Sequence, residues 1–148
     1  MNSKPLKIIL ADDDESDRTN FIDAIEESRV KTVVLTVKDG VELMDHLSNE
    51  NIPVPHLLFL DLNMPRKNGL ECLKEIRQNE RLKDVAVAIY STSSYEKDIE
   101  ETFQYGANVY IKKPTNFKVL KSVLNKVLSA AYVYREPPFS IDNFIFKI

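Results

Sequence analysis

The stretch LKIILADDDESD, at residues 6–17, joins a short apolar run directly to three consecutive aspartates. The run LKIILA is almost unbroken in apolar residues, which is typical of a strand buried on both faces of a parallel sheet. Neighbouring carboxylates at the end of such a strand repel one another and cost free energy unless a cation lies among them. The stretch therefore predicts a buried strand that ends at a binding site for a positively charged group.

Four further apolar runs follow along the chain, and amphipathic stretches separate them. The predicted strands are 6–11, 32–37, 56–61, 85–90 and 108–112. The predicted helices, in which apolar residues recur at helical spacing, are 16–28, 40–49, 69–79, 95–105 and 117–131. This strict alternation predicts an α/β fold: a flavodoxin-like, doubly wound parallel sheet of five strands in the order 2-1-3-4-5, with helices on both faces.

Length and composition are those of one globular domain in a soluble protein. The 148 residues are 43% hydrophobic and 29% charged, and no apolar run is long enough to cross a membrane or to form a signal peptide. A single cysteine, Cys72, excludes an internal disulfide and fits a cytoplasmic location. The formal net charge is −3 and the basic residues are not clustered, which argues against a nucleic-acid partner.

The C-terminal segment differs from the rest of the chain. Pro137 and Pro138 cannot continue the last predicted helix, so we expect a domain at 1–131 and an extension at 132–148. The last ten residues, FSIDNFIFKI, are too rich in apolar side chains for a solvated tail. Two interpretations stay open: a segment folded back on its own domain, because exposed apolar patches are disfavoured, or an arm for docking or dimerisation.

Charged and hydroxyl side chains fall at the carboxyl ends of four predicted strands. In this strand order a ligand binds beyond those ends, between the first and third strands, where the order reverses. The side chains expected there are the carboxylates of Asp12, Asp13 and Asp61, together with one hydroxyl from among Tyr90, Ser91 and Thr92 and one ammonium group from Lys112 or Lys113. Asp14 instead suits a helix entrance, where capping and acidic side chains are favoured.

Three carboxylates around one point suit a hard divalent cation, and oxygen ligands suit Mg²⁺. Mg²⁺ keeps several waters and leaves room for a phosphoryl group, whose other oxygens a lysine and a hydroxyl would bind. The chain has no glycine-rich phosphate loop, so a nucleotide is not the obvious phosphate source. A carboxylate can itself accept the phosphoryl group and form an acyl phosphate.

The segments LADDD, LDLNMPRKNG, IYSTSS and YGANVYIKKP, with their spacing, resemble those of a receiver domain of a two-component response regulator. The resemblance covers residues 6 to about 130 and is to the single-domain, chemotaxis type. It implies that Asp61 accepts a phosphoryl group from a phosphohistidine on a sensor histidine kinase or a histidine phosphotransfer protein. It further implies that Asp13, Asp61 and the backbone carbonyl of Asn63 ligate Mg²⁺ directly, with Asp12 acting through water.

The same resemblance implies roles at three further positions. Lys113 would contact the phosphoryl group, Ser91 would shift its hydroxyl toward it, and Tyr110 would change rotamer in response. The added charge would then move the surface formed by the fourth and fifth strands and the helix between them. The resemblance also suggests a cis peptide before Pro114 that points Lys113 inward.

We therefore expect a stand-alone receiver that is a signalling switch rather than an enzyme, with output through protein contacts or a phosphate shuttle. One alternative is a Mg²⁺-dependent phosphohydrolase, but such enzymes usually carry a second acid two residues after the nucleophile, where this chain has Asn63. A receiver-like binding module that is never phosphorylated is a second alternative. A homodimer also stays possible.

Overall fold

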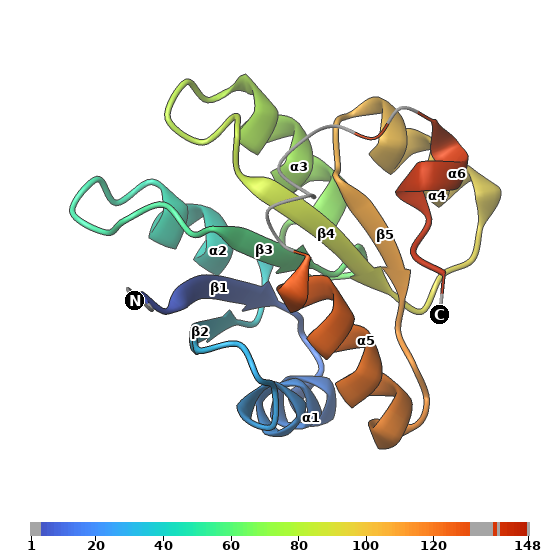
Figure 1. The fold of residues 1–148 in the computed structure, drawn as a ribbon. Helices are drawn as coiled ribbons and strands as arrows, with labels where there is room; N and C mark the ends of the chain where they lie inside the picture. Colours follow the sequence, from blue (N-terminus) through green and yellow to red (C-terminus); the bar gives the residue numbers. More distant parts are fainter. Residues whose placement is uncertain (1–3, 131–137, 139, 148) are drawn as a thin grey trace.

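A computed structural model of the chain describes residues 4–130, 138 and 140–147. It contains a parallel sheet with the strand order β2-β1-β3-β4-β5, which confirms the predicted topology (Figure 1). The strands are β1 (Leu6–Ala11), β2 (Thr32–Val37), β3 (Leu57–Leu60), β4 (Ala86–Ser91) and β5 (Val109–Lys112). The helices are α1 (Glu15–Glu26), α2 (Gly40–Leu47), α3 (Gly69–Gln78), α4 (Glu96–Gln104), α5 (Phe117–Ser129) and α6 (Ile141–Phe144).

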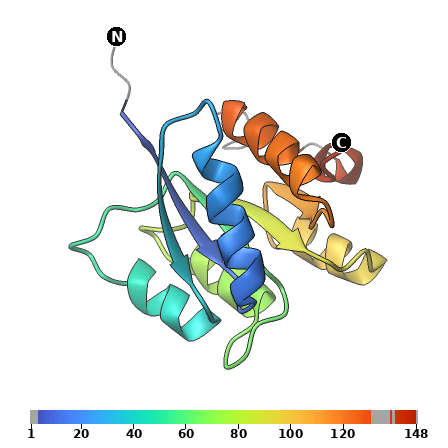
Figure 2. The ribbon, with the colours of Figure 1, turned by 90° about the horizontal axis from the view of Figure 1, so that it is seen from below.

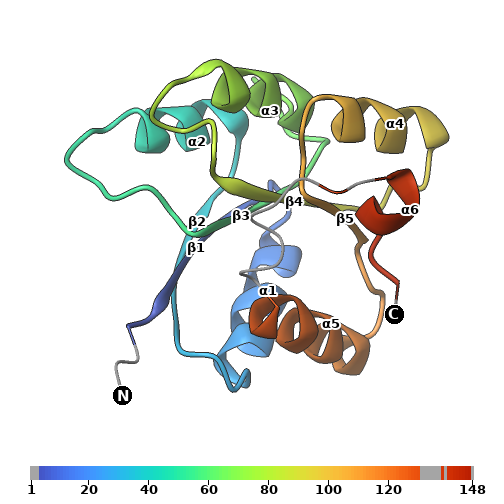
Figure 3. The same ribbon diagram turned by 45° about the horizontal axis from the view of Figure 1, so that its top comes forward.

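The helices form a layer on each face of the sheet. Helices α2, α3 and α4 cover one face, and α1 and α5 cover the other, as Figure 3 shows. From the second face, α1 and α5 lie side by side over the strands (Figure 2). Every residue of β3 and β4 is buried, because both faces of these central strands are covered by helices. The core is accordingly divided into two apolar clusters, one on each side of the sheet.

Polar side chains fix the starts of most of these helices. The side chains that accept a backbone N–H at the helix start are Asp14 for α1, Asp39 for α2, Asn68 for α3 and Asn116 for α5. Such N-caps satisfy donors that the helix itself leaves free, and each typically stabilises a helix by about 1 kcal/mol. The placement of Asp14 at a helix entrance, expected from the sequence, is confirmed.

The boundaries of the five predicted helices and five strands agree with the structure to within two residues at each end. Pro137 lies outside the described residues, and α5 already ends at Ser129. The short helix α6 was not predicted. Among the described helices, none combines the length and the apolar character that a membrane crossing requires.

Gly69, the first residue of α3, lies directly behind the backbone of Asp61. A Cβ atom at this position would overlap the carbonyl oxygen of Asp61 and approach the Cα atom of Leu62 to 2.9 Å. We expect Gly69→Ala to lower the free energy of unfolding by about 2 kcal/mol or more, because backbone cannot move aside as a flexible side chain can. Urea denaturation measures this loss.

Gly106→Ala provides the comparison for this variant. Gly106 has a φ of 88°, and the atoms nearest to an added Cβ there belong to the flexible Arg77 side chain, at 3.2 Å or more. A left-handed φ alone should cost about 1 kcal/mol. A Gly69→Ala protein as stable as the wild type would contradict the close approach of α3 to the Asp61 backbone.

Candidate functional site

The acidic part of the site lies at the carboxyl ends of the neighbouring strands β1 and β3. The parallel register pairs Ala11 with Leu60, so that the next residues, Asp12 and Asp61, leave the sheet side by side. The N–H of Asp61 donates to the carbonyl oxygen of Ala11 at 3.0 Å and continues the pairing one step further. The strand order therefore brings together two acids that lie far apart in the sequence.

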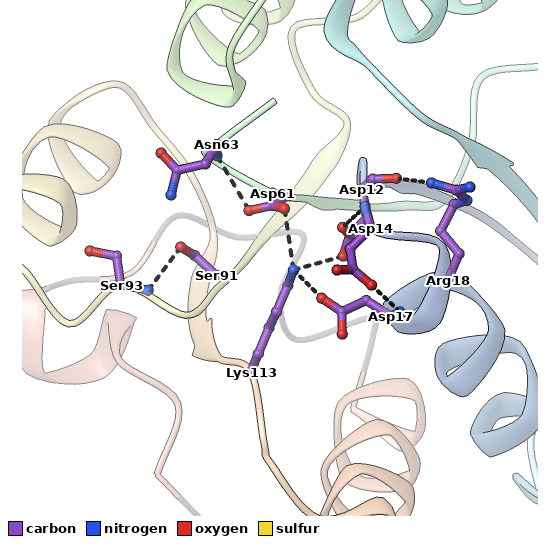
Figure 4. Close-up of polar contacts among 9 residues, drawn as sticks. All are labelled: Asp12, Asp14, Asp17, Arg18, Asp61, Asn63, Ser91, Ser93 and Lys113. Carbon is purple, nitrogen blue, oxygen red and sulfur yellow. Dashed lines mark hydrogen bonds and ion pairs between the residues drawn. The ribbon is translucent and has the colours of Figure 1, made fainter. Parts of the chain in front are cut away.

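The basic part of the site comes from the end of β5. The register pairs Ser91 of β4 with Lys112, and the N–H of Lys113 donates to the Ser91 carbonyl oxygen at 2.8 Å. The Lys113 side chain then reaches across the strand ends toward β1 and β3 (Figure 4). No cis peptide occurs in the described part of the chain, so the cis bond expected before Pro114 was wrong. The hydrogen bond to Ser91 and the reach of a long side chain are enough to bring the ammonium group to the carboxylates.

The carboxylates of Asp12, Asp13 and Asp61 each place an oxygen within 4.8 Å of the others. Asp12 is fully buried and Asp61 is only 5% exposed, whereas Asp13 is exposed to solvent. Asp12 Oδ1 accepts the N–H of Asp14 at 3.0 Å, and Asp61 Oδ1 accepts the N–H of Asn63 at 3.3 Å. The other carboxylate oxygen of Asp12 is buried and faces the ammonium group of Lys113 at 2.8 Å. Three carboxylates this close together, one of them fully buried, fit a divalent cation.

Lys113 is the cation that the structure places among these acids. Its Nζ atom lies 2.8 Å from Asp12 Oδ2, 2.8 Å from Asp17 Oδ2 and 3.2 Å from Asp61 Oδ2. The contact with Asp12 is an ion pair by distance but lacks the angle of a hydrogen bond. Burial lowers the pKa of Lys113, but the nearby aspartates more than offset this, so its pKa is raised and it stays charged.

Burial has the opposite effect on the acids. It raises the pKa of Asp61 to about 6, although the charge of Lys113 works against this rise. Burial also raises the pKa of Asp12, again opposed by Lys113. One ammonium group therefore does not fully compensate two buried carboxylates, and the site favours a further positive charge.

This imbalance predicts how the stability of the metal-free protein depends on pH. The folded-state pKa of Asp61, about 6, lies above the value of 3.8 expected for the unfolded chain, so the folded protein binds this proton more tightly. The contribution of Asp61 is therefore fully present at low pH and is lost as pH rises through about 6. We expect the free energy of unfolding of the wild type, relative to that of Asp61→Asn, to increase as the pH falls from about 7 to about 4, the window set by the folded pKa of about 6 and the unfolded value of 3.8.

Urea denaturation of both proteins in the presence of a chelator measures this difference. Asparagine keeps the size of the side chain but does not titrate, so the effects of groups far from Asp61 cancel in the comparison. A difference between the two proteins that stays constant with pH would show that the Asp61 carboxyl group does not titrate abnormally.

Ser91 and Tyr110 lie on the β4 side of the site, and both are buried. The Ser91 hydroxyl oxygen accepts the N–H of Ser93 at 3.1 Å (Figure 4). The Tyr110 hydroxyl donates to the Ser93 carbonyl oxygen at 2.9 Å. Both side chains thus contact the same loop between β4 and α4. The neighbouring hydroxyl residue Thr92 is exposed.

Two residues of α1 contribute to the site although sequence reasoning gave them no role. Asp17 pairs with Lys113, and Arg18 donates from Nη1 to the carbonyl oxygen of Asp12 at 2.8 Å. Asp17 lies one helical turn after the N-cap Asp14, whose side chain accepts the N–H of Asp17 at 2.9 Å. This spacing puts Asp17 over the helix entrance, next to the strand ends, and is the signal that could have identified it.

Comparison with known proteins places this geometry in a family. Residues 8–125 match the family model described as the response regulator receiver domain. Over 132 residues the chain is 32% identical to response regulator Rcp1 of Synechocystis sp., covering 86% of this chain and 90% of Rcp1. Over 96 residues it is 36% identical to a CheY homologue, a chemotaxis protein of Campylobacter jejuni, covering 64% of this chain and 72% of the homologue.

Solved structures give the same result. The phosphorylated cyanobacterial phytochrome response regulator RcpA has a TM-score of 0.81 and 34% identity, covering 87% of this chain and 95% of RcpA. The Mn²⁺-bound form of Rcp1 has a TM-score of 0.78 and 32% identity, covering 84% of this chain and 93% of Rcp1. On its sequence, its strand order and these relatives, the chain belongs to the response regulator receiver domains, the signalling switches of two-component systems.

Proposed function

We propose that Asp61 of this chain accepts a phosphoryl group from a phosphohistidine and that the resulting acyl phosphate switches the contacts of the protein with its partners. The observation that carries this proposal is the position of the Asp61 carboxylate. It lies 3.2 Å from the Lys113 ammonium group and beside the carboxylates of Asp12 and Asp13, at the rim of the sheet. A phosphoryl group bound there would lie between the Lys113 ammonium group and a metal ion held by the three carboxylates.

In the transfer step, a carboxylate oxygen of Asp61 forms a bond to phosphorus while the bond between phosphorus and the histidine nitrogen breaks. When the phosphohistidine carries a proton on its other ring nitrogen, the imidazole leaves as the neutral base, so no protein base is required. This kind of transition state depends on in-line positioning and on stabilisation of the phosphoryl oxygens. Lys113 is held in place by Asp12 and Asp17 before the reaction, and its charge supplies part of that stabilisation.

A divalent cation is the second positive charge that the site can hold, and we assign it as Mg²⁺. Asp13, Asp61 and the backbone carbonyl of Asn63 would ligate it, and the buried oxygen of Asp12 would bind one of its waters. Oxygen donors alone, two of them carboxylates, suit Mg²⁺ and also Mn²⁺, the ion named for the Rcp1 structure. When bound, the ion would neutralise charge on the phosphoryl oxygens.

The acyl phosphate would act through Ser91 and Tyr110. Phosphorylation adds about −1.5 to −2 charges and strong acceptor oxygens. The Ser91 hydroxyl already accepts the N–H of Ser93, and its own hydrogen is available to donate to a phosphoryl oxygen. The Tyr110 ring is already buried, and its hydroxyl donates to the Ser93 carbonyl oxygen. Phosphorylation would therefore raise the population of this rotamer rather than create a new one.

The partner that supplies the phosphoryl group would be a sensor histidine kinase or a histidine phosphotransfer protein, in the cytoplasm. The chain covers 90% of response regulator Rcp1, and we expect output through protein contacts or passage of the phosphate to another protein. We expect no nucleic-acid partner, because the net charge is −3 and the basic residues are not clustered. A homodimer is compatible with this function.

The test is the intact mass of the protein after incubation with acetyl phosphate, with and without Mg²⁺. We expect one added phosphoryl group that requires Mg²⁺ and is removed by hydroxylamine, as an acyl phosphate should be. An unchanged mass under conditions where Mg²⁺ binding is demonstrated would favour a receiver-like module that is never phosphorylated.

A further inference from the structure

Residues 140–147, here called the C-terminal strap, lie along the free edge of β5, the last strand of the sheet (Figures 1 and 3). Ile145 forms a parallel bridge with Tyr110, and the N–H of Phe146 donates to the Tyr110 carbonyl oxygen at 2.9 Å. The strap therefore contacts the backbone of the residue assigned to the switch.

Phe144 anchors the strap in the core. Its side chain is fully buried, and its ring centroid lies 5.5 Å from that of Phe103 in α4 and 5.9 Å from that of Tyr110 in β5. The Tyr110 and Phe144 rings meet edge to face, a favourable arrangement for aromatic pairs. The strap thus packs against both α4 and β5 through a residue that directly contacts the Tyr110 ring.

This contact restricts the rotamers open to Tyr110. Its hydroxyl now points toward β4 and donates to the carbonyl oxygen of Ser93 at 2.9 Å. Side chains occupy discrete rotamers, and the alternative to this inward one swings the ring toward the free edge of β5. Phe144 comes from that edge, since its neighbour Ile145 pairs with Tyr110 there, and its ring already contacts the Tyr110 ring. A Tyr110 ring that swings outward would therefore move toward the strap.

We propose that the C-terminal strap holds Tyr110 in its inward rotamer, with Phe144 as the positioning residue, and thereby favours phosphoryl binding at Asp61. The inference rests on the proposed function, because it assumes that Ser91 and Tyr110 respond to the phosphoryl group. Coupling of this kind is reciprocal: docking of the strap tightens phosphoryl binding, and phosphoryl binding tightens docking of the strap by the same factor.

The first experiment is a titration with beryllofluoride, an analogue of the phosphoryl group, in the presence of Mg²⁺, for the wild type and Phe144→Ala. We expect Phe144→Ala to weaken analogue binding by about fivefold or more, the lower end of typical coupling between sites. Phe117→Ala removes an exposed aromatic ring at the start of α5 and is the matched control, with wild-type affinity expected.

Two measurements separate this role from general damage to the fold. In a double-mutant cycle, Phe144→Ala should have no further effect on analogue affinity once Tyr110→Ala has removed the ring it contacts. In the unmodified wild type, hydrogen exchange at the amide of Phe146 should slow when beryllofluoride binds. The second measurement needs no variant, so it holds even if Phe144→Ala fails to fold.

The outcomes distinguish the role of the strap from the function of Asp61 as phosphoacceptor. Unchanged or tighter analogue binding in a folded Phe144→Ala protein would overturn the role of the strap and leave the function of Asp61 intact. Unchanged exchange at Phe146 on analogue binding would overturn it as well. Failure of the wild type to bind the analogue, although Mg²⁺ binds, would instead contradict the proposed function itself.

Discussion

Replacing Asp61 with asparagine is expected to abolish phosphoryl uptake from acetyl phosphate. The side-chain amide lacks the negatively charged oxygen that attacks phosphorus, yet it keeps the size of the carboxylate and an oxygen that can accept the N–H of Asn63. The fold should survive and gain stability near neutral pH, because burial penalises the charged form of Asp61 and raises its pKa to about 6. Intact mass and urea denaturation measure the two effects.

Asp14→Asn is the matched control for this variant. It makes the same chemical change at an exposed acid nearby, and asparagine is as good an N-cap for α1 as aspartate. Uptake equal to that of the wild type is expected. Retained uptake in Asp61→Asn would refute the assignment of Asp61, whereas loss of uptake in Asp14→Asn would show that the assay reports general damage to the site.

Replacing Lys113 with methionine is expected to impair both folding stability and phosphoryl uptake. Methionine is similar in length to lysine and keeps its apolar stem, but it leaves the buried Asp12 and Asp61 without their cation. Loss of one partner of a buried ion pair typically costs about 3–5 kcal/mol in the free energy of unfolding. Uptake should slow by about a hundredfold, because one charge that stabilises the transition state is removed.

The effect of Mg²⁺ on the stability of Lys113→Met makes this prediction specific. Mg²⁺ should restore part of the stability of Lys113→Met, since it supplies a cation to the same carboxylates. Lys112→Met is the control: the neighbouring lysine is exposed, and its loss should leave stability and uptake nearly unchanged. Equal behaviour of the two variants in urea denaturation and mass measurements would mean that Lys113 has no special role.

The sheet could be predicted because its signal is local. The runs LLFL and AVAIY are apolar throughout, which is the pattern typical of a strand buried on both faces. Parallel connections between such strands leave few topologies, and one of them places Asp12 beside Asp61. The convergence of Asp12 and Asp61 with a lysine from the end of the fifth strand therefore followed from the strand order, and the resemblance to receiver domains selected Lys113 over Lys112.

Other features could not be predicted because they depend on tertiary contacts. Asp17 pairs with Lys113 only because α1 starts directly beside the strand ends, and its sequence context is that of an ordinary exposed helix. Helix α6 has four residues, which is too short to show helical periodicity. The apolar residues of the extension indicated burial, but the sequence left open whether Phe144 would meet its own domain or another chain.

The most direct test of the central claim is to locate the phosphoryl group on the chain. Borohydride reduces an aspartyl phosphate to homoserine, so reduction after phosphorylation in Mg²⁺, followed by peptide mass mapping, identifies the modified residue. The account predicts homoserine at position 61 and nowhere else. Homoserine at position 12 or 13, or no modified residue in a protein that has bound Mg²⁺, would contradict it.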